Sequence, residues 1–132
     1  MIATVLFPLK LIALDTPSPA PTCAEGDIKQ MVSCYAKKNG VPDKLAHYVV
    51  EKESHYNPDE TGDMEITCKT GINKGQPVRA RGLVQITDCY YPEVTDEQAF
   101  DPNFNLEFGM KLMKDKKTCM SQFTTCRNYY RS

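Results

Sequence analysis

Six cysteines in a chain of 132 residues constrain the fold more than any other feature of the sequence. An even number of cysteines in a short chain is typical of a disulfide framework made in an oxidising compartment. Spacing alone does not choose among the pairings of Cys23, Cys34, Cys68, Cys89, Cys119 and Cys126. Zinc binding is disfavoured, because the chain has no C-x-x-C pair and His47 and His55 form no ligand pattern.

The N-terminal residues have the composition of a leader. Residues 1–14 are mostly apolar, with Lys10 among them, and the Pro-rich sequence TPSPAPT follows Asp15. Ser18 and Ala20 are small residues of the kind that precede a signal-peptidase cut. The alternative is a start codon assigned too far upstream. We therefore predict a leader or signal segment with a linker over residues 1–26, and a protein exported to the periplasm or the extracellular space.

Residues 27–132 are predicted to form one domain. Composition and charge limit the class of protein to which this domain can belong. Hydrophobic residues make up 41% of the chain and charged residues 25%, which is ordinary globular composition. The net charge of −1 argues against a nucleic-acid partner, since such proteins usually carry a basic excess. No apolar run reaches the roughly 18 residues that a membrane-spanning helix needs.

Two amphipathic helices are predicted at the start of this domain. Asp27 is a candidate N-cap for the first helix, which Asn39-Gly40 ends. Its apolar residues recur with the spacing of one helical face, and they are Ile28, Met31, Val32, Tyr35 and Ala36. The second helix starts after Pro42 and runs to about Ser54.

The second half predicts fewer regular elements. Residues 59–81 indicate a long loop or a small β-hairpin that Cys68 pins. Thr95 caps one short helical turn, and a longer helix opens at Asp101-Pro102 and runs to about Lys117. The predicted fold class is mainly α, with one irregular or hairpin insertion and disulfide stabilisation.

Glu53 is the residue of the second helix that breaks its pattern. The spacing that joins Ala46, Val49 and Val50 into an apolar face places Glu53 on the same face, whereas Glu51 points to solvent. A carboxyl group on an apolar face is desolvated, which raises its pKa and suits it to act as a general acid. The alternative is that the helix frays and Glu53 is simply hydrated.

Three short motifs follow one another between residues 28 and 117. They are Glu53-Ser54 with Tyr56-Asn57-Pro58, then Gly82-Leu83-Val84-Gln85, then Asp101-Pro102 with Asn105-Leu106, Gly109 and Leu112-Met113. In this order they resemble the motifs of the lytic transglycosylases with a soluble-transglycosylase (SLT) domain. In that family the first motif carries the catalytic glutamate, and the second usually reads Gly-Leu-Met-Gln.

The chain departs from the family pattern in three ways. The segment between the first two motifs is longer than usual and carries Cys68, and Val84 replaces the usual methionine. The fourth motif, usually Ala-Tyr-Asn-x-Gly, is represented only by Asn128 with Tyr129 and Tyr130. An incomplete fourth motif bears on substrate binding and on the surroundings of the glutamate.

The resemblance implies a lysozyme-like helical domain that cleaves the β-1,4 bond between N-acetylmuramic acid and N-acetylglucosamine in peptidoglycan. Glu53 would act as the single acid and base and leave 1,6-anhydro ends. One alternative is a goose-type-like lysozyme, which hydrolyses the same bond with a second carboxylate. Asp59, Glu60 and Asp63 are candidates for that carboxylate, or are solvated loop charges. The sequence also leaves open a non-catalytic cell-wall-binding module and a secreted effector or inhibitor.

The remaining site residues follow from the same resemblance. Ser54 orients Glu53 or is a plain helix-end residue, and Gln85 binds sugar or braces the site unless it faces solvent from a short strand. Gly82 serves backbone geometry or a close approach to ligand. Tyr129 or Tyr130 donates a hydrogen bond to the glutamate or packs on the surface.

The expected partner is the glycan strand of peptidoglycan. Proton transfer and substrate positioning need no cofactor and no metal, so none is predicted. Small members of the family often serve a secretion system, a conjugation machine or a phage, so the resemblance also implies an assembly of this kind as a partner.

Overall fold

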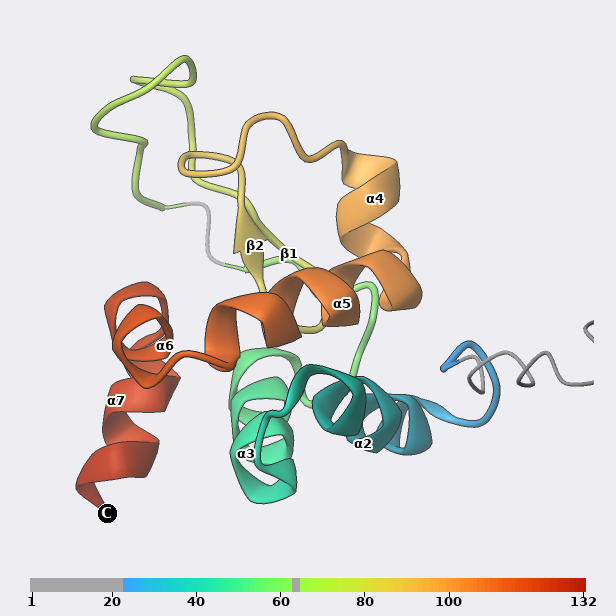
Figure 1. Cartoon of the computed structure of the whole chain (residues 1–132). Coiled ribbons are helices and arrows are strands. Elements are labelled where there is room, and N and C mark those ends of the chain that lie inside the picture. Colours follow the sequence, from blue (N-terminus) through green and yellow to red (C-terminus); the bar gives the residue numbers. More distant parts are fainter. Residues whose placement is uncertain (1–22, 63–64) are drawn as a thin grey trace, which may run out of the picture.

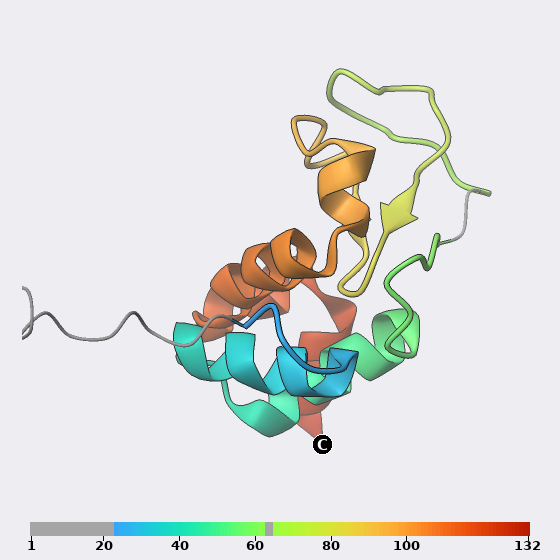
Figure 2. The same ribbon diagram turned by 90° about the vertical axis from the view of Figure 1, so that its right-hand side faces the viewer.

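The computed structural model describes residues 23–62 and 65–132. These residues form six helices and one two-stranded sheet, arranged with helices below and an irregular insertion above (Figure 1). Figure 2 shows the insertion projecting from the helical part. Residues 1–22 of the leader and linker predicted over residues 1–26, and the candidate Asp63, lie outside the described residues. None of the described helices is both long enough and apolar enough to cross a membrane.

Helix α2 (Ile28–Asn39) confirms the first predicted helix and its cap. The Asp27 carboxylate accepts a hydrogen bond from the backbone of Gln30, and the Gln30 side chain accepts one in return from the backbone of Asp27. Gly40 ends the helix in the left-handed conformation, with φ of 71°. Four of the five predicted apolar residues are buried, namely Met31, Val32, Tyr35 and Ala36.

Helix α3 (Asp43–Ser54) has the bounds that the sequence predicts. It buries Leu45, Ala46, Val49 and Val50 completely. His55 stops the helix in the left-handed conformation, with φ of 53°. The chain turns away immediately after Ser54, and Glu53 therefore lies in the last turn of α3.

The long-loop alternative predicted for residues 59–81 is confirmed, and a small β-hairpin begins where this segment ends. The paired strands are β1 (Ala80–Arg81) and β2 (Ile86–Thr87), with Ala80 opposite Thr87. Residues 65–79 form an irregular loop in which one isolated bridge joins Thr67 to Pro77. We call the segment 65–79 the insertion.

The C-terminal half holds four helices. These are α4 (Asp96–Phe100), α5 (Pro102–Met113), α6 (Lys116–Gln122) and α7 (Thr124–Arg131). The prediction that one helix runs to about Lys117 is wrong, because α5 ends at Met113 and Asp115 caps a new helix by accepting from the backbone of Thr118. Aspartate favours such a cap because its short side chain reaches the free N–H groups of the next turn.

Three disulfides staple this fold, and the described residues hold no free cysteine. Cys23–Cys34 ties the N-terminal segment of the described chain to α2, so the folded region includes at least residue 23. Cys68–Cys89 ties the insertion to the segment after β2, as the sequence predicted for Cys68. Cys119–Cys126 joins α6 to α7. The predicted mainly helical class with disulfide stabilisation is confirmed.

The side chain of Asn105 joins α5 to the turn between the two strands. Its Oδ1 accepts from the backbone N–H of Val84 at 2.9 Å, and its Nδ2 donates to the carbonyls of Arg81 at 3.1 Å and Ala99 at 2.9 Å. Asn105 is fully buried, so water does not replace these bonds. Beside it, a side chain on Gly109 would meet Val84 at 2.7 Å, which keeps α5 close against the turn.

We predict that Asn105→Ala destabilises the domain by roughly 2–4 kcal/mol, because it leaves three buried backbone groups without partners. The melting temperature of the oxidised protein, followed by circular dichroism, would fall by about 10 °C or more. Asn128→Ala is the matched control, since Asn128 is an exposed asparagine on α7. Equal melting temperatures for the two variants would contradict this role of Asn105.

Candidate active site

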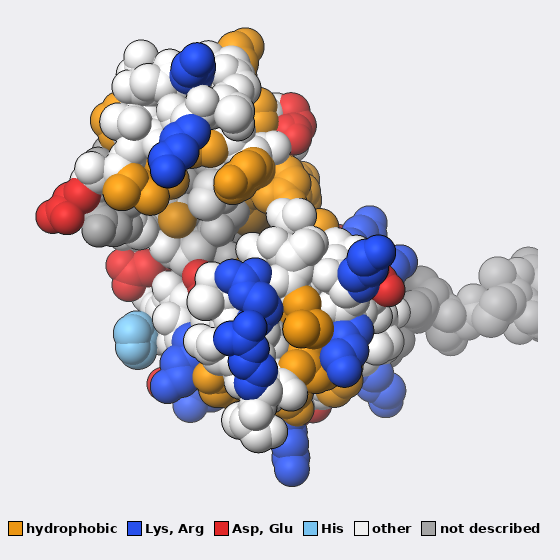
Figure 3. Space-filling view, turned by 90° about the vertical axis from the view of Figure 1, so that its left-hand side faces the viewer, with side chains coloured by type: hydrophobic (Ala, Val, Ile, Leu, Met, Phe, Trp, Pro, Cys, Tyr) orange, Lys and Arg blue, Asp and Glu red, His pale blue; other side chains and the backbone are white. Residues whose placement is uncertain are grey.

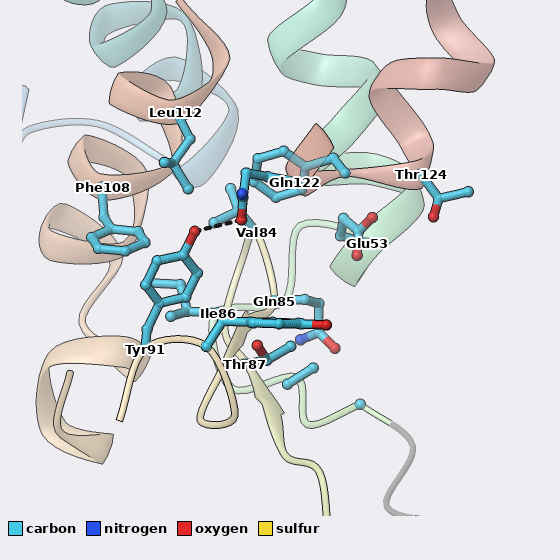
Figure 4. A pocket seen from close by; sticks show the side chains of 14 residues that line it. Glu53, Val84, Gln85, Ile86, Thr87, Tyr91, Phe108, Leu112, Gln122 and Thr124 are labelled. Atoms are coloured by element: carbon cyan, nitrogen blue, oxygen red, sulfur yellow. Dashed lines mark hydrogen bonds between the residues drawn. The ribbon is translucent and has the colours of Figure 1, made fainter. Parts of the chain in front are cut away.

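A cleft of about 270 Å³ lies between the sheet and the ends of the helices. Its walls come from α3, the β1–β2 hairpin, the segment after β2, α5 and the junction of α6 with α7. Figure 3 shows the hollow between the insertion and the helices, and Figure 4 shows Glu53 and Thr124 across the pocket from Tyr91, Phe108 and Leu112. The cleft is thus a meeting point of segments that are far apart in the sequence.

Glu53 is the only carboxylate among the described residues that line the cleft. It is half-buried, and its Oε2 accepts a hydrogen bond at 3.0 Å from the hydroxyl of Thr125. Burial raises the pKa of the Glu53 carboxyl, and the Thr125 hydrogen bond opposes that rise. The net upward shift favours a protonated carboxyl group over a wider pH range than an exposed glutamate would allow.

Gln85 also lines the cleft, from the turn between the strands. Its backbone has φ of 58°, and its side-chain amide donates to the carbonyls of Glu60 at 3.1 Å and Gly82 at 2.9 Å. Gln85 is therefore not the solvent-facing residue of a strand. Its amide braces the turn against residue 60, while the side chain forms part of the wall of the cleft.

Gly82 lies behind the cleft rather than in its lining. Its φ is 78°, and a side chain there would come within 2.4 Å of the carbonyl oxygen of Ala99. A residue with a Cβ would be strained in that conformation and would clash with that carbonyl. The geometry agrees with a backbone role for Gly82.

Three predicted residues make no side-chain hydrogen bond to the Glu53 carboxyl group in the structure. The Ser54 hydroxyl is buried and donates to the carbonyl of Val50 at 3.0 Å. Tyr129 packs against Tyr48 and Tyr130, with ring centroids 5.6 and 5.3 Å away. Neither Tyr129 nor Tyr130 is among the lining residues of the cleft. The roles of these three residues toward substrate stay predictions.

Thr125 and an aromatic wall were not predicted from the sequence. Tyr91 packs edge-on against Phe108 at 4.9 Å between centroids and donates to Gln122 at 2.6 Å. The sequence did indicate that Phe108 packs beside Phe104, since the two residues lie four positions apart on one helix face. For Thr125 the sequence shows only that it precedes Cys126, and no sequence pattern links it to Glu53.

The sequence offered Asp59, Glu60 and Asp63 as candidates for a second carboxylate. Asp59 and Glu60 are not among the lining residues, and Asp63 is outside the described residues. Arg81 is buried and donates to the carbonyls of Ile86 and Val94 and to Asp96. Arg81 is therefore part of the scaffold that supports the hairpin.

One cluster of metal-ligand residue types exists in the described part of the chain. It comprises Cys68, Asp88 and Cys89. The two sulfurs are joined in a disulfide, so they do not offer the thiolates that zinc binding requires. The Glu53 cleft contains no such cluster among the described residues.

Comparison with known families identifies the class of protein. A family model described as the transglycosylase SLT domain matches residues 30–128. The chain belongs to this family, and its membership supports a lytic-transglycosylase-like function on peptidoglycan. Searches of curated proteins and of solved structures found no match.

We predict that Glu53→Gln raises the melting temperature at neutral pH. The folded pKa of Glu53 lies above the unfolded one, so the folded state retains a proton that the unfolded state has lost. Stability therefore falls as the pH rises from about 4.3 through the folded pKa. Glutamine does not titrate and still accepts from Thr125, so the variant avoids this loss.

Melting curves from about pH 4 to pH 8 test this prediction. The stabilisation should shrink toward the acidic end, where glutamate is protonated in both states. Glu51→Gln removes the same charge from the same helix outside the cleft and is the control. An equal gain from both variants would assign the effect to net charge rather than to desolvation.

Proposed function

We propose that this chain cleaves the β-1,4 bond between N-acetylmuramic acid and N-acetylglucosamine, with Glu53 as both acid and base. The observation that carries this proposal is the placement of a desolvated carboxyl group, with raised pKa, in an open cleft. A general acid works best when its pKa lies near the operating pH. Glu53 meets that condition better than a fully hydrated glutamate.

In the first step, protonated Glu53 donates its proton to the glycosidic oxygen. The bond from that oxygen to C1 of the muramoyl residue breaks, and the N-acetylglucosamine unit leaves with a new hydroxyl group. The carboxylate that remains is negatively charged. The Thr125 hydroxyl, 3.0 Å away, stabilises that charge by donating a hydrogen bond.

In the second step, the Glu53 carboxylate removes the proton from the 6-hydroxyl of the muramoyl residue. The 6-oxygen then bonds to C1 and closes a 1,6-anhydro ring. Glu53 is protonated again and the cycle is complete, without water as a reactant. One carboxyl group therefore performs both proton transfers.

Hydrolysis is the alternative reaction of this site. It usually requires a second carboxylate, which acts as nucleophile or activates water. Among the described residues of the cleft, none besides Glu53 carries a carboxylate. This favours ring closure over attack by water, and a goose-type-like lysozyme or a wall-binding module is the second choice.

We also propose that the protein works outside the cytoplasm. Three disulfides fit an oxidising compartment, and a domain that acts on peptidoglycan must reach the wall. Association with a secretion, conjugation or phage assembly stays a prediction from the family.

Products from purified peptidoglycan test the reaction directly. We expect mass spectrometry to find muropeptides with 1,6-anhydro ends after digestion by the oxidised protein. Glu53→Gln should lower their yield at least about 100-fold, because it removes the proton donor. Glu51→Gln is the matched control and should retain full activity.

Different products would change the assignment. Reducing ends in place of anhydro ends would contradict the transglycosylase reaction and favour the lysozyme. An absence of products from folded protein would favour a binding module. Activity that survives in Glu53→Gln would remove Glu53 from the catalytic role.

We predict that Thr125→Val moves the alkaline limb of the pH–activity profile to higher pH. Valine has nearly the same shape but no hydroxyl, so the Glu53 carboxylate loses its hydrogen bond and its pKa rises further. The profile of kcat/KM against pH gives the measurement.

Thr124→Val is the control for this change. Thr124 lines the same cleft, but its hydroxyl accepts from Arg127 rather than donating to Glu53. An alkaline limb that stays in place in Thr125→Val, or that moves equally in both variants, would contradict the role of Thr125.

A further inference from the structure

We infer that the glycan strand leaves the cleft across Tyr90 and continues into a second groove on the insertion. This inference rests on the proposed function and names a further saccharide-binding surface. The second groove, which we call the insertion groove, has a volume of about 340 Å³. It is lined by residues 66–70, 78, 87, 89 and 90. Thr87 and Tyr90 also line the cleft, so the two hollows adjoin one another at these two residues.

Tyr90 stands where the two hollows meet, and its ring is open to a ligand. The residue is 73% exposed, which is unusual for an aromatic side chain in a domain of this size. The backbone on either side of it is nevertheless fixed. Cys89 is bonded to Cys68, and Tyr91 packs on Phe108 and bonds to Gln122. An exposed ring on an anchored backbone binds a ligand at low entropic cost.

The far wall of the insertion groove is anchored to the same short segment. The Asn73 side chain donates to the carbonyl of Asp88 at 2.9 Å, and the backbone N–H of Arg79 donates to the Asp88 carboxylate at 3.1 Å. The Cys68–Cys89 disulfide adds a covalent link. These contacts hold the insertion and Tyr90 in one arrangement, so the groove exists before any ligand arrives.

The chemistry of the insertion groove suits a sugar. Ile66 and Val78 are apolar residues of its lining, and Thr67 and Thr70 are residues of the same lining that carry hydroxyl groups. A β-linked pyranose likewise has apolar C–H faces and a rim of hydroxyl groups. Its C–H face packs well on an aromatic ring such as Tyr90, because the ring face carries partial negative charge. Figure 3 shows hydrophobic side chains gathered on the insertion side of the hollow.

The occupant is the glycan strand itself, because a polymer bound in the cleft has to leave it at both ends. The boundary between the two hollows at Tyr90 offers one exit that is already lined for sugar. A stem peptide of peptidoglycan would be a different ligand with different chemistry. Oligosaccharides of N-acetylglucosamine carry no peptide, so they separate the two cases.

The test measures binding and not catalysis. The full oxidised chain with Glu53→Gln is titrated calorimetrically with the β-1,4-linked trimer and hexamer of N-acetylglucosamine. We expect the hexamer to bind at least about tenfold more tightly, because only the longer ligand reaches the insertion groove. Adding Tyr90→Ala should weaken hexamer binding about tenfold, and by more than it weakens trimer binding, because Tyr90 borders both the cleft and the insertion groove. Thr70→Trp should act in the same way by filling the groove.

Two matched variants guard against indirect effects. Tyr90→Phe keeps the ring and should retain hexamer binding. Ile72→Ala removes another exposed apolar side chain of the insertion, 83% exposed and outside both hollows, and should change nothing. Thermal melting of each variant shows that the fold is intact.

Three results would overturn the inference. Equal binding of the trimer and the hexamer to the parent protein would mean that the insertion groove holds no sugar. Hexamer binding that persists in Tyr90→Ala would remove Tyr90 from the path of the glycan strand. Tyr90-dependent binding of peptide-bearing fragments alone would assign the groove to the stem peptide. Failure of the proposed function is seen separately, as an absence of anhydro products in the digestion experiment.

Discussion

The buried amide of Asn105 is the interaction on which the arrangement of the site depends. It satisfies one donor and two acceptors from the backbone of other segments, so α5 and the β1–β2 turn are held at one distance. Gly82 and Gly109 permit that distance because neither has a side chain to separate the layers. The β1–β2 turn also positions Gln85, which forms part of the cleft wall. A polar group deep in the core thus fixes geometry that apolar packing alone would leave adjustable.

The raised pKa of Glu53 depends on the position of this residue in the last turn of α3. The apolar face of α3 continues to the last turn, and His55 then reverses the chain, so the carboxyl group is only half-covered. Complete burial would oppose the charged form that the proposed second proton transfer needs, and full exposure would remove the upward shift of the Glu53 pKa. Thr125, delivered by α7, moderates the shift. The disulfide between Cys119 and Cys126 holds the start of α7 near α6, which restricts the displacement of Thr125.

Much of the fold could be predicted from interactions between residues that are close together in the sequence. Asp27, Gly40 and Thr95 mark helix ends through bonds to backbone groups close by, and the sequence places all three correctly. The two paired strands could not be located from the sequence, because β1 and β2 are two residues long and too short to show alternation. The Glu53–Thr125 bond joins residues 72 positions apart, and no local pattern carries such information. The placement of Glu53 itself was readable, because helical periodicity extends over the whole of α3.

The insertion illustrates how a loop without a core of its own is kept in place. Ile66 and Ile72 are largely exposed, so burial of apolar surface contributes little to its order. The anchors are instead a disulfide and hydrogen bonds to Asp88, all of which converge on residues 88–89. A loop fixed in this way leaves its apolar side chains free for a ligand, whereas a loop fixed by packing would bury them. The loop loses its conformational entropy during folding, so ligand binding is not weakened by the need to order it.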